Sequence, residues 1–184
     1  MKITGKTVEL VPAREADREK IYLWLCRSDL TPSVMGPPLY PDHPIPGYDT
    51  FCAEYPSSFF DASGDETGRV FMITRDGEAI GTIGYDLLDK VQDRVVLDLW
   101  MRAERDCGHG HGSDALNALC THIHETYGIT RFILSPSARN RRAIAAYRKA
   151  GFEIEKALTR DDQEREFGAV EYDDNVLMVK RFPA

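Results

Sequence analysis

The spacing of apolar residues predicts two well-defined helices in the second half of the chain. The first spans Ser113–Tyr127 and has Gly128 as its C-terminal stop. Apolar residues recur along it at the i, i+3, i+4, i+7 spacing of a helix with one buried face: Leu116, Leu119, Cys120 and Ile123. The second helix spans Asn140–Ala150, starts at a residue type suited to an N-cap, and ends before Gly151.

The pattern is weaker in the first half of the chain. Ala13–Cys26 predicts a helix with Ile21 and Trp24 on its apolar face. Asp49–Phe60 predicts a second, weaker helix. The segment between them, Thr31–Tyr48, is rich in proline, which removes backbone donors and excludes a long helix or a central strand. It is therefore a long loop, which is either a lid or binding loop or a connector without a function.

Short apolar runs predict a β-sheet. We expect its strands at Thr7–Val11, Arg69–Thr74, Ala79–Asp86, Arg94–Met101, Arg131–Ser135, Phe152–Ala157 and Asn175–Phe182. An Asp-Gly pair within 75–78 suits a tight hairpin turn between the second and third of these. Arg94–Met101 is apolar on both faces apart from Asp98, which indicates a central strand. The last two strands are expected to flank an acidic hairpin. The order of elements predicts an α+β domain, a mixed α/β arrangement in three layers.

The length and composition indicate a single domain with an acidic surface. A chain of 184 residues is long enough for one domain, here 1–184, with a core that needs no disulfide or structural metal. The formal net charge of −7, without a basic stripe, argues against nucleic acid and favours cationic partners, although mild acidity also serves solubility alone. The four cysteines lack CxxC spacing, so we expect no metal site and a reducing cytoplasm. No apolar run approaches the length of a membrane span.

The candidate chemistry begins at a glycine-rich turn. Residues 108–113 read Gly-His-Gly-His-Gly-Ser and stand between the strand that holds Asp98 and the helix that starts at Ser113. Glycines there let a ligand approach the backbone, and the free N–H groups and dipole of the helix start favour an anion such as a diphosphate. The turn lacks the Lys of a P-loop and the spacing of a dinucleotide-binding fingerprint. Alone, such a turn is equally consistent with a structural role.

A second motif follows the turn and makes the pair specific. Asn140, Ala143, Tyr147, Lys149, Gly151 and Phe152 match the pattern N-x-x-A-x-x-x-Y-x-K-x-G-F. Together the two motifs resemble those of the GNAT superfamily of N-acetyltransferases, in which R/Q-x-x-G-x-G/A binds the diphosphate of coenzyme A. The first motif fits in two registers: one starts at Arg105, and the other, aligned on the helix start, puts Cys107 where a basic or polar residue is usual.

The resemblance implies a fold and a donor site. The fold is a central, twisted, mostly antiparallel sheet with helices on both faces. The co-substrate is acetyl-CoA, with no metal. The implied donor contacts come from Leu99, Trp100, Met101, Gly108, His109, Gly110, His111, Gly112, Ser113 and Asn140. The main chain of Leu99–Met101 would pair with the pantetheine arm. Asn140 would contact the donor or only cap its helix, and the two histidines would either add charge near phosphate or lie exposed in the loop.

Two side chains have implied catalytic roles. Tyr147 would protonate the leaving thiolate, or else only pack in the helix core face; a phenol pKa near 10 is close to that of a thiol. Asp98 would take a proton from the acceptor amine or anchor its ammonium. The alternative is that Asp98 is a buried partner for an Arg or Lys. The acidic hairpin, which includes Asp161, Asp162, Glu164 and Glu166, would attract a polycation or be plain solvated surface.

The acceptor remains open between three classes. The stretch Ser135–Phe152 and the position of Asp98 are similar to the bacterial aminoglycoside 6′-N-acetyltransferases. That similarity implies acetyl transfer to a primary amine of a small cationic molecule, aminoglycoside-like, by direct attack in a ternary complex, and hence antibiotic resistance. A protein N-terminal acetyltransferase of the ribosomal-protein type and a non-catalytic acyl-CoA-binding module are the alternatives. We expect a cytoplasmic monomer or homodimer that binds neither nucleic acid nor membrane.

Overall fold

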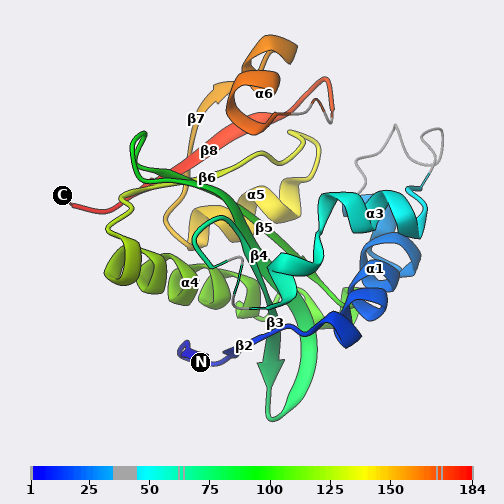
Figure 1. Ribbon diagram of the computed structural model, residues 1–184. Coiled ribbons are helices and arrows are strands. Elements are labelled where there is room, and N and C mark those ends of the chain that lie inside the picture. Colours follow the sequence, from blue (N-terminus) through cyan, green and yellow to red (C-terminus); the bar gives the residue numbers. More distant parts are fainter. Residues whose placement is uncertain are drawn as a thin grey trace.

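The computed structural model describes residues 2–34, 45–61, 63, 65–168, 170 and 172–183 (Figure 1). The strands of this part are β1 (Ile3–Thr4), β2 (Glu9–Pro12), β3 (Arg69–Arg75), β4 (Glu78–Asp89), β5 (Arg94–Met101), β6 (Arg131–Leu134), β7 (Glu153–Ala157) and β8 (Val176–Arg181). Its α-helices are α1 (Arg18–Arg27), α2 (Thr31–Val34), α3 (Tyr48–Glu54), α4 (His111–Tyr127), α5 (Arg141–Lys149) and α6 (Arg160–Phe167).

All of these strands join one sheet. Their spatial order is β1-β2-β3-β4-β5-β6-β8-β7, and every pair is antiparallel except β5 with β6. The expected hairpin between β3 and β4 is present, and Asp76 and Gly77 both take positive φ in its turn. The predicted class, a mostly antiparallel mixed sheet with helices on both faces, is confirmed.

Side chains alternate between two apolar layers. On one face, Ile83 and Leu97 belong to a core that includes the buried side of α4, such as Leu116. On the other face, Met72 and Trp100 pack with residues of α1 and α3. Helix α6 covers the same face as α3 but at the β6–β8 end, through a small cluster of its own. Figure 1 shows α4 and α5 apart from α1, α3 and α6.

The N-terminal third of the chain differs in detail from the sequence-based prediction. Most of the expected helix 13–26 forms, as α1 preceded by the 3₁₀ turn Glu15–Asp17. The expected helix 49–60 divides into α3 and the 3₁₀ turn Ser57–Phe60, because Pro56 between them lacks the N–H that a continuous helix needs. The proline-rich segment 31–48 begins with the short helix α2, and its residues 35–44 lie outside the described residues.

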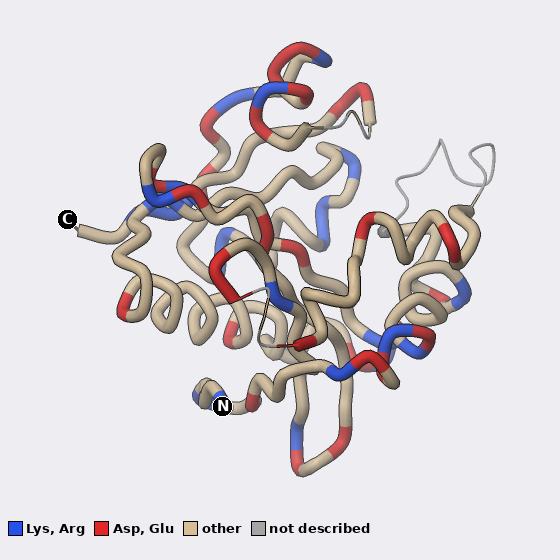
Figure 2. The backbone as a smooth tube through the Cα atoms, in the orientation of Figure 1, with Lys and Arg blue, Asp and Glu red and all other residues tan. Residues whose placement is uncertain are grey.

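The expected acidic hairpin is wrong: the segment forms helix α6. Thr159 and Asp162 make a reciprocal capping box at its start, and Gly168 ends it in the left-handed conformation. Acidic and basic residues alternate along this helix (Figure 2). Asp162 pairs with Lys156 and Arg165, so its charge is largely balanced.

The point that positions the candidate site is the junction of β5 and β6. These parallel strands pair only at the start of β5, over Arg94–Val96. From Asp98 onward, β5 pairs with β4 alone, as far as Met101. Among the described strands, none pairs with the other edge of β5 in this segment, and Gly112 of the turn that follows lies close to Leu99. In the described part of the chain, no helix is long and apolar enough to cross a membrane.

Candidate functional site

The glycine-rich turn forms the start of α4. The helix begins at His111, two residues before the expected Ser113, and Gly110 is its N-cap. Gly108 and Gly110 have φ of +80° and +85°, which side chains rarely adopt, and a Cβ on either would meet no atom within 4 Å. Space is thus open beside the backbone, where the first N–H groups of α4 lack helical partners. Their arrangement fits a diphosphate.

The two histidines of the turn differ. His109 is exposed, in accord with the plain loop alternative. His111 was expected to be exposed under that alternative, but it is buried, with 6% of its surface accessible. Its Nε2 lies 3.0 Å from Nη1 of Arg75, and its Nδ1 lies 3.4 Å from the Thr7 hydroxyl. Because a guanidinium only donates, Nε2 accepts and the ring is neutral.

Burial, and then the Arg75 charge, lower the pKa of His111. Asp114, one turn into α4, accepts the backbone N–H groups of Lys6, Thr7 and Val8. Burial alone would raise the pKa of Asp114, but these hydrogen bonds lower it overall. These hydrogen bonds join the β1–β2 connection to α4. The side chains of His111 and Asp114 therefore fix the position of the glycine-rich turn.

Helix α5 packs beside the turn. Asn140 caps it, since its side-chain oxygen accepts the N–H of Ala143 at 3.1 Å, and its amide donates to the Ser33 carbonyl at 3.0 Å. Of the two alternatives for Asn140, helix capping is therefore observed. The Ser113 hydroxyl donates to the Ala146 carbonyl at 2.7 Å and joins the two helices.

The segment of β5 next to the turn has a free edge. Leu99, Trp100 and Met101 pair with Ile83, Thr82 and Gly81 of β4, and β6 does not reach them. Trp100 and Met101 are buried, so the free edge is offered by backbone rather than by side chains. An extended arm that carries amide groups can add to such an edge.

Tyr147 lies in the core between α5 and the sheet. It is 8% accessible, and its ring packs against Phe152 at 6.4 Å between centroids. Burial in the apolar cluster that includes Leu116 accounts for its packing role. A phenol here is at the opposite side of β5 from Asp98, because odd and even positions of the strand face different layers.

Asp98 is not the buried ion-pair partner that the sequence allowed. Its side chain is exposed, and among the described residues no Arg or Lys forms an ion pair with it. Tyr55, at the end of α3, donates a short hydrogen bond to its Oδ2. Surrounding protein displaces enough water to raise the pKa of the carboxyl, against the opposing effect of that hydrogen bond. Asp98 is thus a carboxylate that water reaches and that many protein atoms surround.

Two further acidic residues, which the sequence did not single out, lie near Asp98. Asp86 of β4 and Asp98 are on the same face of adjacent strands, since Gly84 is directly opposite Asp98. Burial and then the charge of Asp98 raise the pKa of Asp86 to about 6. The same two causes raise the pKa of Glu54, at the end of α3. We call this group the carboxylate cluster (Glu54, Asp86 and Asp98). None of its members forms an ion pair with an Arg or Lys of the described residues, and no cation opposes the rise of their pKa values.

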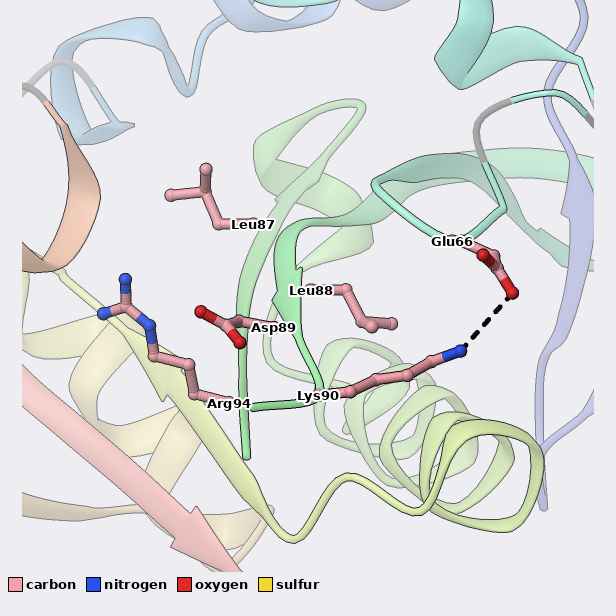
Figure 3. Close-up of a pocket in the computed structure, with 6 residues that line it drawn as sticks. All are labelled: Glu66, Leu87, Leu88, Asp89, Lys90 and Arg94. Atoms are coloured by element: carbon pink, nitrogen blue, oxygen red, sulfur yellow. Dashed lines mark hydrogen bonds and ion pairs between the residues drawn. The ribbon is translucent and has the colours of Figure 1, made fainter. Parts of the chain in front are cut away.

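A cavity lies on a different surface. It measures about 430 Å³ and is lined by Glu66, Leu87, Leu88, Asp89, Lys90 and Arg94 (Figure 3). Figure 3 shows Lys90 reaching Glu66 across it, at 3.3 Å. Arg94 begins β5, whereas the glycine-rich turn follows its other end, roughly 23 Å along an extended strand. This cavity is therefore separate from the glycine-rich turn. No group of three or more His, Cys, Asp or Glu residues in the described ranges could hold a metal ion.

Comparison with known sequences identifies one domain type. A profile described as acetyltransferase (GNAT) domain matches residues 7–153, well over half of the chain. The spermine/spermidine N(1)-acetyltransferase of Bacillus subtilis (strain 168) is 34% identical over 88 residues, or 45% of this chain. The match spans 58% of that relative's own length.

Solved structures show the same fold. AAC(6′)-Ib in complex with paromomycin and acetyl-CoA has a TM-score of 0.70 at 21% identity, over 96% of this chain and 94% of that one. RimL, a ribosomal L7/L12 alpha-N-protein acetyltransferase in complex with coenzyme A, has a TM-score of 0.73 at 19% identity, over 99% and 98%. At such identities, the likeness extends to the fold and leaves the acceptor undecided.

Proposed function

We propose, from the premise that this chain belongs to the GNAT acetyltransferase family, that it moves an acetyl group from acetyl-CoA to a primary amine of a small cationic acceptor. Enzymes of this family use acetyl-CoA, and the open backbone around Gly108 and Gly110 fits its diphosphate. The acceptor is an aminoglycoside-like or polyamine-like molecule with several ammonium groups. The proposal for the donor side extends to the free N–H groups of Gly108–Ser113 and the free edge of Leu99–Met101.

The observation that carries the acceptor class is the carboxylate cluster. Burial raises the pKa of all three acidic groups, and the charge of Asp98 raises that of Glu54 and Asp86 further. Asp98 has a tyrosine rather than a cation as its side-chain partner. Such an arrangement destabilises the free protein relative to a neutral surface, and a bound polycation relieves it. The partial relative from B. subtilis, named for spermine and spermidine, supports the same acceptor chemistry.

The two faces of β5 then divide the proton transfers. Asp98 takes a proton from the acceptor ammonium, and the rise in its pKa that burial causes makes the carboxylate a stronger base. The neutral amine attacks the thioester carbonyl directly, so the new C–N bond forms as the C–S bond breaks. Tyr147 gives its proton to the sulfur as the C–S bond breaks. The nitrogen then loses its second proton to solvent, which leaves the amide, and Tyr147 recovers a proton from solvent. Acetyl-CoA supplies the activated acyl group.

The test is the rate of free thiol release from acetyl-CoA with a panel of acceptors. Aminoglycosides and polyamines should be turned over, with kcat/KM rising with the number of ammonium groups on the acceptor. Short peptides with a neutral side-chain composition should react much more slowly. A preference for such peptides would support protein N-terminal acetylation instead, and binding of acetyl-CoA without release for any amine would support a non-catalytic module.

A further inference from the structure

Arg142 is the basic side chain that the structure holds at the entrance of the glycine-rich turn. Its Nη1 donates to Oε2 of Glu104 at 2.5 Å, and Glu104 opens the 3₁₀ turn that leads into Gly108. Burial raises the pKa of the Cys107 thiol, and a hydrogen bond from Arg142 opposes that rise. Arg142 thus contacts the residue directly before the first glycine.

The packing of α5 fixes this position. The Arg142 side chain contacts Glu104 and Cys107, which precede the first glycine. One helical turn later, the Ala146 carbonyl accepts the Ser113 hydroxyl and holds α5 against the start of α4. By contrast, Arg141 lies on another side of α5, where it lines a groove with Ile154 and Val176. Of these two neighbouring arginines, only Arg142 is directed toward the turn.

The turn itself lacks a strong cation. Residues 107–113 supply backbone N–H groups and two histidines, of which His111 is neutral and engaged with Arg75. A diphosphate at the turn would gain from a guanidinium, which donates two parallel hydrogen bonds to phosphate oxygens. The present partner of Arg142 is no obstacle, since the side chains of Arg142 and Glu104 are 46% and 52% accessible and exposed ion pairs are weak.

We propose that Arg142 is a side-chain ligand of the coenzyme A diphosphate. In the free protein Glu104 orients Arg142 by an ion pair, and it competes with the diphosphate for the guanidinium. The inference rests on the proposed use of acetyl-CoA but concerns this chain's own means of binding it. According to this inference, α5 contributes a side chain to donor binding in addition to the backbone N–H groups of the turn. Glu104, with a negative charge close to the phosphates, opposes binding.

The experiment measures the dissociation constant of CoA by calorimetry for the wild type and three variants. Arg142→Gln should weaken binding about ten-fold, as expected for a charge-assisted hydrogen bond to the ligand. Glu104→Gln should leave the affinity unchanged or tighten it, because it frees Arg142 and removes a repulsive charge. Arg141→Gln is the matched control and should bind as the wild type does. Melting temperatures of all variants verify that they are folded.

The signs of these effects separate the alternatives. If Arg142→Gln keeps the wild-type affinity, or if it and Glu104→Gln weaken binding equally, the pair only holds α5 in place and the inference is wrong. A loss that is present with CoA but absent with 3′-dephospho-CoA would assign Arg142 to the 3′-phosphate and overturn the diphosphate assignment. If the wild type itself bound no CoA, the proposed function would fail first.

Discussion

The donor side and the acceptor side of the candidate site are built by different means. The donor side is mostly backbone: the N–H groups of Gly108–Ser113 and the edge of β5, with glycines at positive φ that leave open space. The acceptor side is made of carboxyl and phenol side chains from α3, β4 and β5. A backbone-built site lies within one short segment, whereas a side-chain-built site depends on which distant segments the fold brings together.

This contrast has a consequence for specificity. Backbone N–H groups recognise phosphate whatever the neighbouring side chains are, so the donor side tolerates replacements such as Cys107. The acceptor side can change its ligand by single substitutions at Glu54, Asp86 or Asp98, because each contributes a whole charge. Under the proposed function, the backbone of the fold binds the donor, and these few side chains select the acceptor.

We propose that the Tyr147 hydroxyl protonates the leaving thiolate, and its removal has the largest expected effect among the first four of these predictions. Tyr147→Phe should lower turnover on the order of 100-fold while acetyl-CoA affinity stays nearly unchanged, because the proton is needed only as the thiolate forms. Steady-state kinetics and calorimetry on one preparation measure both. Tyr127→Phe, at the far end of α4, is the control. A turnover within about two-fold of wild type would leave Tyr147 with a packing role only.

Gly110 tests the backbone-built side. Gly110→Ala should weaken acetyl-CoA binding about ten-fold, since the methyl group both strains the positive φ and occupies the space beside the N–H groups. Gly77→Ala is a closely matched control: Gly77 has φ of +80°, its Cβ would likewise meet nothing within 4 Å, and it lies in the β3–β4 hairpin. Equal affinity for the two variants would show that the turn does not contact the donor.

Tyr55 tests the side-chain-built side through pH. Its hydrogen bond favours the charged form of Asp98, so Tyr55→Phe should raise the pKa of Asp98 further. The acid limb of the kcat/KM profile, which reports deprotonation of the base in the free enzyme, should then move to higher pH. An unchanged limb together with lower activity would assign Tyr55 to acceptor contact rather than to Asp98.

The smallest expected effect concerns stability. The pKa of Asp86 is about 6 in the folded chain, above its unfolded value, so this group's contribution to stability is present at low pH and is lost as pH rises through 6. Asp86→Asn should therefore stabilise the free protein at pH 8 by about 1 kcal/mol after allowance for screening, which is about 2–4 °C in Tm. The gain should vanish below about pH 4. Asp76→Asn, at an exposed carboxylate in the hairpin, should change Tm at neither pH.

The same contrast explains what the sequence could predict. Helices α4 and α5 and the Asn140 cap are local patterns, and the predicted helix bounds agree with the structure to within two residues. Tyr55 was not found because it meets Asp98 across 43 positions of the chain, a distance that no local pattern spans. Asp86 ends the predicted strand Ala79–Asp86, where acidic residues are often solvated, and only the β4–β5 register places it on the same face as Asp98.

Two further differences between expectation and structure, at α6 and at His111, arise at helix ends. The charged segment that forms α6 lacks an apolar stripe, so helical periodicity gave no signal; the Thr159–Asp162 capping pair and Gly168 were the available evidence. One of the two alternatives for His111 left it exposed in the loop, yet at the first position of α4 its side chain is buried against Thr7 and Arg75.

The central claim is that Asp98 acts on a cationic acceptor through its charge. The most direct measurement is kcat/KM of Asp98→Asn for a polyamine or aminoglycoside acceptor, with acetyl-CoA affinity and Tm on the same preparation. The account predicts a fall on the order of 100-fold in kcat/KM, wild-type acetyl-CoA affinity and an unchanged or higher Tm, since a desolvated charge without a cationic partner is removed. Wild-type kcat/KM in the Asp98→Asn variant, with the protein fully folded, would contradict it.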